Sequence, residues 1–116
     1  MGKVMASLSE MSVRQLLARR RQLGTRVADP EQTLRGVLVS RGRRCSSAGC
    51  HCQEGELHGP YTYLAVYMDG RSRTLYVPAA ARPIVERCVE VTQRGEALLV
   101  QISQINLELL RRRALE

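Results

Sequence analysis

Apolar residues near the start of the chain recur at the spacing of one helix face. The stripe consists of Leu8, Met11, Leu16, Leu17 and Leu23. Ser7 or Ser9 has a side chain that can cap the first turn, and Gly24 is placed to stop the last one. The pattern therefore predicts an N-terminal helix over residues 7–24.

Strand-forming residues dominate the middle of the chain. Apolar positions within residues 34–39 predict a first strand, which leads into a cluster of arginines. Two further β-rich runs, residues 61–68 and 71–77, flank the dipeptide Asp69-Gly70. This dipeptide is typical of a two-residue type I′ turn, so the two runs are predicted to form an antiparallel hairpin.

The turn also fixes which residues of the hairpin face each other. Met68 would stand opposite Arg71, and the side chains would then alternate between two faces. One face would carry the pairs Tyr63–Tyr76 and Ala65–Thr74, and the other the pairs Leu64–Leu75 and Val66–Arg73. The tyrosines are therefore either half of the core or a platform on which nucleic-acid bases stack. The platform would consist of Tyr61, Tyr63 and Tyr67 beside Arg71 and Arg73.

From Pro78 onward the apolar residues follow alternating spacings of four and three. With Gly95 in one slot, the seam consists of Ile84, Cys88, Val91, Leu98, Ile102, Ile105 and Leu109. This pattern predicts an amphipathic helical region over residues 79–113, either one long helix or two helices that meet at Gly95. The seam can pack on the N-terminal helix or on a second copy, so residues 84–109 are a candidate homodimer interface.

These segments together predict an α+β fold in a single domain, residues 1–116. The N-terminal helix would precede a loop and a small antiparallel sheet within residues 34–78, followed by the helical region. A chain of this length is near the common size of one domain. Because no apolar run approaches the roughly 20 residues that span a bilayer, no membrane association is expected.

Three of the four cysteines and both histidines fall within residues 45–58. Cys45, Cys50, Cys52 and His58 follow the spacing C-x4-C-x-C-x5-H. Zinc takes four tetrahedral ligands from cysteine sulfur and histidine nitrogen, and a tight loop containing a glycine can direct two thiolates at one ion. These four residues are therefore predicted to bind Zn²⁺. Four ligands leave no open position, so the site is expected to be structural.

Other assignments of the cysteines are open. His51 or Cys88 could replace His58 as the fourth ligand, although an extended segment would turn His51 away from the ion and Cys88 lies on the apolar seam. A disulfide is disfavoured because the absence of a hydrophobic leader indicates a reducing cytoplasm. An iron–sulfur cluster usually needs four cysteines. Inert loop cysteines would lack apolar burial among these polar and glycine residues.

Charge adds a second indication of function. The formal net charge is +7, and all but one of the 18 basic residues are arginine. Arginine presents a planar fork of donors that matches phosphate, which favours a nucleic-acid partner, with DNA ahead of RNA. The candidate contacts are Arg41, Arg43, Arg44, Arg71 and Arg73, extended by Arg19, Arg20 and Arg21 or by residues 111–113. The alternative is an ordinary solvated surface, and cations in a last helical turn also suit the helix dipole.

Three segments of the chain, 44–52, 57–64 and 74–78, resemble a family of small uncharacterised prokaryotic proteins. Members of that family share R-C-G-K-P-G-C-x-C, then H-G-P-Y-Y-Y-L, then a basic strand and a helix pair. The resemblance spans about residues 34–110. It is specific at Cys45, Gly49, Cys50, Cys52, His58, Gly59, Pro60 and Tyr61.

This resemblance implies zinc and a nucleic-acid setting among mobile-element genes, but no mechanism. The chain has Ser46-Ser47-Ala48 where the family often has Gly-Lys-Pro, so it lacks one basic residue beside the site. A weaker likeness to SWIM-type zinc fingers rests on the Cys-x-Cys and the later histidine alone.

Motifs of catalysis are missing from the sequence. It has no Gly-rich phosphate loop, no H-E-x-x-H, no nucleophile elbow and no deaminase signature, so we expect that the protein is not an enzyme. Two functions fit the sequence. One is a zinc-stabilised nucleic-acid-binding accessory or regulatory protein. The alternative is a helical dimerisation or protein-interaction adaptor with a structural zinc site and no nucleic-acid role.

Overall fold

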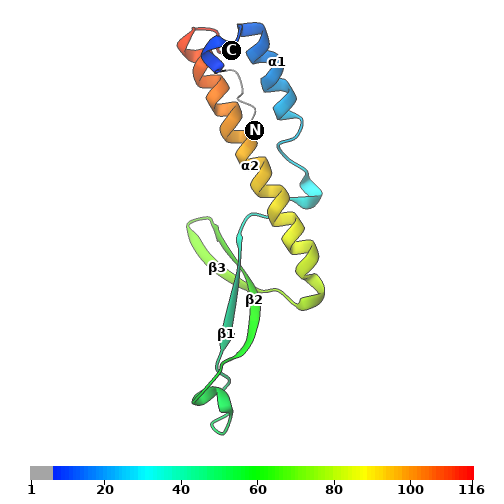
Figure 1. Ribbon diagram of the computed structural model, residues 1–116, viewed down its shortest axis with the longest axis vertical. Coiled ribbons are helices and arrows are strands. Elements are labelled where there is room, and N and C mark those ends of the chain that lie inside the picture. Colours follow the sequence, from blue (N-terminus) through cyan, green and yellow to red (C-terminus); the bar gives the residue numbers. More distant parts are fainter. Residues whose placement is uncertain (1–6) are drawn as a thin grey trace. The chain divides into compact units, whose positions relative to one another are not determined.

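The computed structural model describes residues 7–116 and has the α+β arrangement expected from the sequence (Figure 1). Its main elements are α1 (Val13–Gly24), β1 (Val37–Arg43), β2 (His58–Met68), β3 (Arg71–Tyr76) and α2 (Arg82–Arg111). The chain packs as two compact units. We call residues 32–91 the sheet unit, and the described residues up to 31 together with 92–116 the helical unit. The expectation of a single domain stays a prediction.

Helix α1 begins at Val13, later than the predicted start at residue 7. The Ser12 hydroxyl accepts a hydrogen bond from the Gln15 N–H at 3.1 Å, and the Gln15 side chain accepts one from the Ser12 N–H at 2.8 Å. This reciprocal capping box satisfies two backbone donors and fixes the start of the helix. Ser7 caps a separate 3-10 turn, Leu8–Glu10. The helix was predicted correctly, but its capping residue was not.

The helical unit has its own apolar core. Leu16 and Leu23 of α1 pack with Ile105 and Leu109 of α2, and all four side chains are buried. Full burial of an aliphatic side chain of this size contributes about 1.5–3 kcal/mol. The later part of the predicted seam therefore packs on α1 within the chain.

Arg112 joins the end of α2 to the 3-10 turn before α1. Its guanidinium donates to the backbone oxygens of Met11 at 2.6 Å and Leu8 at 2.9 Å, and it pairs with Glu108 at 2.7 Å. Hydrogen bonds from Arg111 and then from Arg112 lower the pKa of Glu108 to about 2. Arg112 thus supplies a donor to the Met11 carbonyl oxygen and a second donor to the Leu8 carbonyl oxygen, which already accepts the Met11 N–H at 3.1 Å.

Helix α2 runs without interruption through Gly95, so of the two predicted alternatives the structure has one long helix. A Cβ atom at position 95 would overlap the carbonyl oxygen of Val27 in the segment after α1. Glycine costs about 1 kcal/mol relative to alanine inside a helix, and here it permits this close backbone approach. Although α2 is long, neither it nor another helix within residues 7–116 is apolar enough to span a membrane.

The three strands form an antiparallel sheet with β2 in the centre. Asp69 and Gly70 have φ angles of 54° and 75°, as both central residues of a type I′ turn require. The predicted register is confirmed for the pairs Met68–Arg71, Val66–Arg73, Ala65–Thr74, Leu64–Leu75 and Tyr63–Tyr76. The turn residues therefore determine which side chains share a face of this hairpin.

One face of the sheet packs on the first part of α2. Its buried core consists of Leu64, Val66, Val77 and Val89, with Leu34, Leu38, Ala81 and Val85 packed around it. The predicted seam is wrong here, because Ile84 is 64% exposed. Val85 and Val89, one turn apart, face the sheet, and Ile84 is rotated by about 100° from Val85 around the helix axis.

Candidate metal centre and its surroundings

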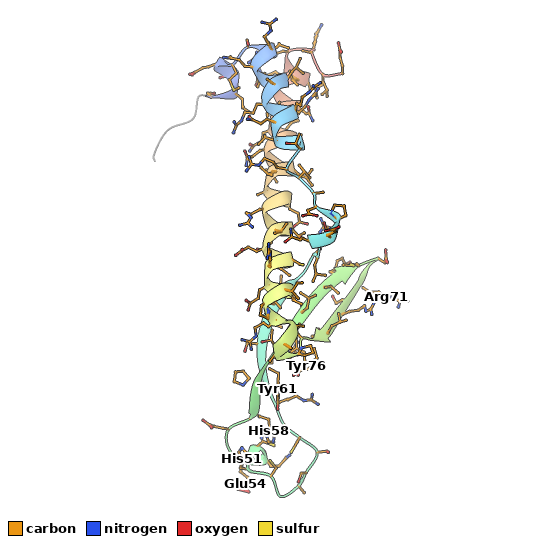
Figure 2. The ribbon with its side chains drawn as sticks, turned by 90° about the vertical axis from the view of Figure 1, so that its right-hand side faces the viewer. His51, Glu54, His58, Tyr61, Arg71 and Tyr76 are labelled. Carbon is orange, nitrogen blue, oxygen red and sulfur yellow. The ribbon has the colours of Figure 1, made fainter. Side chains whose placement is uncertain are left out.

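The predicted metal ligands lie where β1 ends and β2 begins. Arg43, the last residue of β1, pairs with His58, the first residue of β2. This antiparallel pairing brings Cys45 close to His58, and the intervening segment returns with Cys50 and Cys52. We call residues 44–57 the cysteine loop. Figure 2 shows His51 of this loop beside His58.

The ligand atoms of Cys45, Cys50, Cys52 and His58 all lie within 4.8 Å of one another. The sulfurs of Cys45 and Cys52 are 3.6 Å apart, and the Cys50 sulfur is 3.0 Å from His58 Nε2. Zinc–ligand bonds of about 2.0–2.3 Å place tetrahedral ligand atoms about 3.5–3.8 Å apart. Small movements of the side chains would therefore let these four residues bind one metal ion.

The backbone brings Cys50 and Cys52 together by a route that the sequence did not predict. Residues His51–Gln53 form a 3-10 turn, in which the Gln53 N–H donates to the Cys50 carbonyl at 3.1 Å. The expected extended segment is therefore wrong. His51 does not point away, because its Nδ1 lies 3.7 Å from the Cys50 sulfur. His58 approaches this sulfur more closely and is the better-placed ligand.

Cys88 does not belong to the group of possible ligands. It is half-buried on α2, whereas the group contains only residues of the cysteine loop and the start of β2. None of the four cysteines, all of which the structure describes, forms a disulfide. The geometry therefore favours the ligand set with His58 over the alternatives.

Local hydrogen bonds favour the thiolate form of one ligand. A backbone hydrogen bond from Ser47, followed by side-chain bonds with His58, Cys52 and Cys50, lowers the pKa of Cys45 from 9.0 to about 6. The Cys52 sulfur accepts a hydrogen bond from the Cys45 N–H at 3.3 Å, and this bond alone would lower the pKa of Cys52. Burial and the neighbouring thiols outweigh this bond, and the pKa of Cys52 is raised. A bound cation would favour the thiolate at both sites.

Two side chains outside the ligand group hold the cysteine loop in shape. The Arg44 guanidinium donates to the Cys52 carbonyl oxygen, and the Gln53 amide donates to the Cys45 carbonyl oxygen at 2.8 Å. Both bonds connect the start of the loop to its 3-10 turn, and outer hydrogen bonds of this kind orient metal ligands. Sequence reasoning missed Gln53 and gave Arg44 only a phosphate contact. Their hydrogen bonds end on backbone carbonyl oxygens, which every residue has, so no pattern of residue types in the sequence could have predicted these bonds.

The other predicted arginines of the sheet unit are exposed on its two edge strands. Arg41 and Arg43 lie on β1, and Arg71 and Arg73 lie on β3. The Arg41 guanidinium lies 5.4 Å from the centre of the Tyr63 ring. Within residues 7–116, neither Arg43 nor the two arginines of β3 form an ion pair. These charges are therefore available to an anionic partner.

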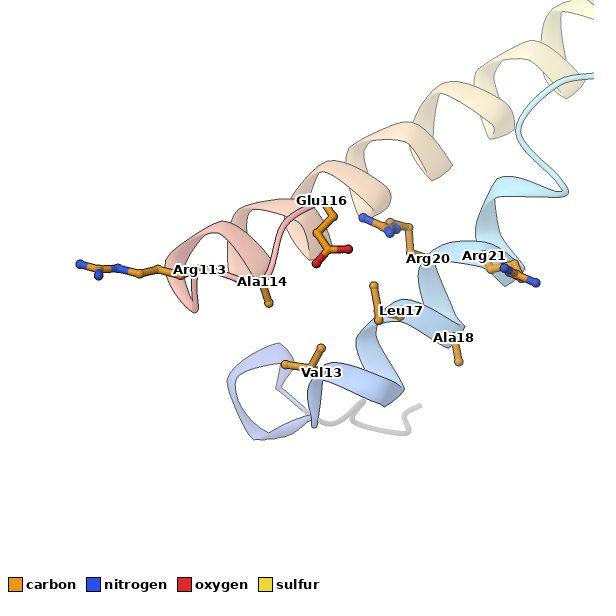
Figure 3. Close-up of a pocket in the computed structure, with 8 residues that line it drawn as sticks. All are labelled: Val13, Leu17, Ala18, Arg20, Arg21, Arg113, Ala114 and Glu116. Carbon is orange, nitrogen blue, oxygen red and sulfur yellow. The ribbon is translucent and has the colours of Figure 1, made fainter.

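The arginines of α1 belong to the helical unit. Arg20 donates to the Asn106 side chain at 2.8 Å, whereas Arg21 is exposed. A hollow of about 960 Å³ lies next to them. In Figure 3, Arg20 and Glu116 are turned toward it and Arg113 extends away. Its lining residues are Val13, Leu17, Ala18, Arg20, Arg21, Arg113, Ala114 and Glu116. This lining includes no cysteine, histidine or serine, so the hollow offers neither a nucleophile nor a metal-ligand set.

The tyrosines lie on the sheet face opposite the core. The core face carries Leu64 and Val66, and alternation along β2 places Tyr63 on the other face. Tyr67 and Tyr76 on that face are 68% and 56% exposed. The expectation that the tyrosines form half of the core is therefore wrong.

The arrangement of arginines around these tyrosines also differs from the prediction. Arg73 pairs with Val66 and Arg71 pairs with Met68, so both belong to the register of the core face. They do not lie beside the tyrosines. Arg41, opposite Tyr61 in the sheet, is the arginine that accompanies them.

The comparison with known proteins gives a family but no activity. Residues 13–87 match the model of a family described as a domain of unknown function, DUF6788. This region includes the cysteine loop and all three strands. No curated protein and no solved structure matches the chain. Since the match covers more than half of the sequence, this chain belongs to the uncharacterised DUF6788 family.

Proposed function

We propose that this protein is a zinc-stabilised, non-catalytic nucleic-acid-binding protein. The observation that carries the proposal is the position of Arg41 and Arg43. Both are exposed on edge strand β1, and Cys45 follows this strand after a single intervening residue. A metal bound by Cys45 would fix the end of the strand and thereby the arginines that it presents.

The ligand set supports zinc in a structural role. Three thiolates and one imidazole suit zinc, and four protein ligands complete its tetrahedral coordination. A catalytic zinc site would keep one position open for water or substrate. The ion would contribute to the folding of the cysteine loop, in which Cys52 is the one fully buried side chain.

The charge of the protein supports a polyanionic partner. The net charge is +7, and the exposed cations of the sheet unit are arginines, which bind phosphate oxygens bidentately. Arg44 is a poor choice for testing this role, because its guanidinium holds the Cys52 carbonyl. Arg43 is the sharper choice, since it forms no ion pair within the described chain.

The test measures binding of the zinc-loaded protein to labelled DNA and RNA by fluorescence anisotropy across a salt series. Arg43→Glu is compared with Arg14→Glu, an exposed position of α1 outside the proposed contacts, because both substitutions change the net charge equally. We expect Arg43→Glu to weaken binding about tenfold more than Arg14→Glu and to reduce the slope of log K against log salt by about one. Equal effects of the two substitutions, or no binding by the wild type, would contradict the proposal.

A second candidate function is assembly with a protein partner through the helical unit. Four apolar side chains of α2 are exposed there: Leu99, Val100, Leu107 and Leu110. They recur at helical spacing and differ from the predicted seam, whose Ile105 and Leu109 are buried against α1. This stripe favours a homodimer or a docked partner helix, and such an adaptor would need no nucleic acid.

A further inference from the structure

All four tyrosines of the chain belong to one face of the sheet. Tyr61, Tyr63 and Tyr67 alternate along β2, and Tyr76 of β3 pairs with Tyr63. The aliphatic core of the sheet unit lies on the opposite face. We call the tyrosine side, together with Arg41, the tyrosine face. An exposed aromatic surface of this kind marks a binding site more often than a random surface does.

Three of the rings hold one another in place. Tyr76 meets Tyr61 and Tyr63 edge to face, with ring centres 6.2 Å and 5.8 Å apart and interplanar angles of 73° and 65°. Figure 2 shows Tyr61 and Tyr76 close together next to the cysteine loop. Tyr61 and Tyr63 are half-buried and each contacts Tyr76, so a ligand would meet rings that are already ordered.

The charge around these rings favours an anionic, aromatic ligand. The Arg41 guanidinium lies 5.4 Å from the centre of the Tyr63 ring. By register the tyrosine face also carries Val37, Val39, Ala65, Ser72 and Thr74, and so it has no carboxylate among the paired residues. A guanidinium beside aromatic rings can bind a phosphate while bases stack on the accessible parts of the rings.

We propose that the tyrosine face binds single-stranded nucleic acid by stacking bases on Tyr61, Tyr63 and Tyr76. This inference rests on the proposed nucleic-acid function and names its substrate class. Arg41 contacts the adjoining phosphate, and Arg43, the next arginine of β1, contacts the backbone of the bound strand beyond it.

The spacing of the rings explains the preference for a single strand. Tyr61 and Tyr63 are two residues apart on β2, which corresponds to about 6.8 Å along a strand. Bases stacked in a duplex are about 3.4 Å apart, so bases on these two rings must separate from each other. A single strand allows this separation, whereas the bases of a duplex are stacked and paired inside it.

The first experiment uses the tyrosine fluorescence of the zinc-loaded wild-type protein. The chain has no tryptophan, and its four tyrosines lie on this face, so the emission reports on the proposed site alone. We expect saturable quenching by a single-stranded oligonucleotide and much weaker quenching by its duplex. Quenching that is equal for both would overturn the proposal. A change in the emission per protein molecule when only the protein concentration is varied would also overturn it, because the face would then bind a second copy.

The second experiment compares Tyr76→Ala with Tyr76→Phe, which keeps the ring. Loss of one stacking ring should weaken single-strand binding about tenfold, while the phenylalanine variant should bind like the wild type. Circular dichroism checks the fold, and if Tyr76→Ala fails to fold, the quenching measurement still decides.

Arg43→Glu separates the two proposals. If it weakens binding while Tyr76→Ala does not, the stacking platform is overturned and the nucleic-acid function stands. If the wild type binds no nucleic acid, both fail.

Discussion

The acidity of the Cys45 and Cys52 thiols is determined by their close neighbours. Cys45 has a lowered pKa, about 6, because the Ser47 backbone and then His58 hydrogen-bond to its sulfur. Cys52 is fully buried, and burial together with the adjacent thiols raises its pKa. Of these two thiols, Cys45 therefore ionises first, and Cys52 gains more from a bound cation.

Removal of one ligand should release the metal. Elemental analysis of purified wild-type protein is expected to give one zinc per chain, and Cys50→Ser should lose stoichiometric zinc because three ligands hold the ion far less tightly than four. Thermal unfolding followed by circular dichroism should then show a lower melting temperature, as it should for the wild type after chelation.

Two variants control for the alternative ligands. Cys88→Ser and His51→Ala should retain zinc, because neither residue belongs to the group of four. Zinc retained by Cys50→Ser, or lost with His51→Ala but kept by His58→Ala, would contradict the ligand assignment.

The spacing of Cys45, Cys50, Cys52 and His58 was sufficient to select the residues that the structure brings together. Spacing restricts which thiols can reach one point, but it says little about the backbone between them. The 3-10 turn at His51–Gln53 depends on local hydrogen bonds, and the Arg44 and Gln53 bonds end on backbone oxygens. No side-chain pattern encodes such bonds, so these details could not be predicted.

At the scale of elements, a two-residue turn motif predicted more of the structure than the long apolar pattern of α2 did. Asp69-Gly70 fixed the hairpin register, since a two-residue turn leaves one pairing available. The apolar pattern of α2 was ambiguous, because Ile84, Val85 and Val89 all fit a helical stripe and only the sheet selects Val85 and Val89. Both faces of the sheet also carry apolar side chains. The alternation of side chains along the strands could not show that the core face, which carries Leu64 and Val66, would pack on α2 in place of the tyrosine face.

Gly95 is expected to be required by its contact with the segment after α1. Alanine at this position would gain about 1 kcal/mol in helix propensity, but its Cβ would overlap the Val27 carbonyl oxygen, and overpacking costs about 1–3 kcal/mol. Because the neighbour is backbone and cannot rotate away, we expect net destabilisation of up to about 2 kcal/mol. Chemical denaturation of Gly95→Ala measures this change.

Gly24→Ala is the matched control for this substitution. Gly24 ends α1, and a Cβ there would have no atom within 4 Å, so the same change should be neutral or stabilising. If both variants were equally stabilised, Gly95 would have no packing role.

At the scale of the whole molecule, the proposed activities divide between the two units. The sheet unit contains the candidate metal ligands, the exposed arginines of β1 and β3 and the tyrosine face. The helical unit contains the exposed apolar stripe of α2, in addition to its own buried core. Each unit has a separate apolar core, so substitutions on the surface of one should leave the function of the other intact.

The two candidate functions can therefore be tested independently in one protein. If the stripe on α2 forms a homodimer, Leu107→Asn should weaken self-association by about tenfold or more, because each buried leucine contributes about 1.5–3 kcal/mol. Ile84→Asn is the control, since Ile84 is 64% exposed on α2 but lies in the sheet unit. Sedimentation velocity over a range of protein concentrations measures the association.

Apolar association depends little on salt, whereas phosphate binding falls steeply as salt rises. A wild type that stays monomeric at every concentration would remove the homodimer and leave the nucleic-acid proposal unaffected. A dimer whose loss also abolished nucleic-acid binding would show that the two units act together.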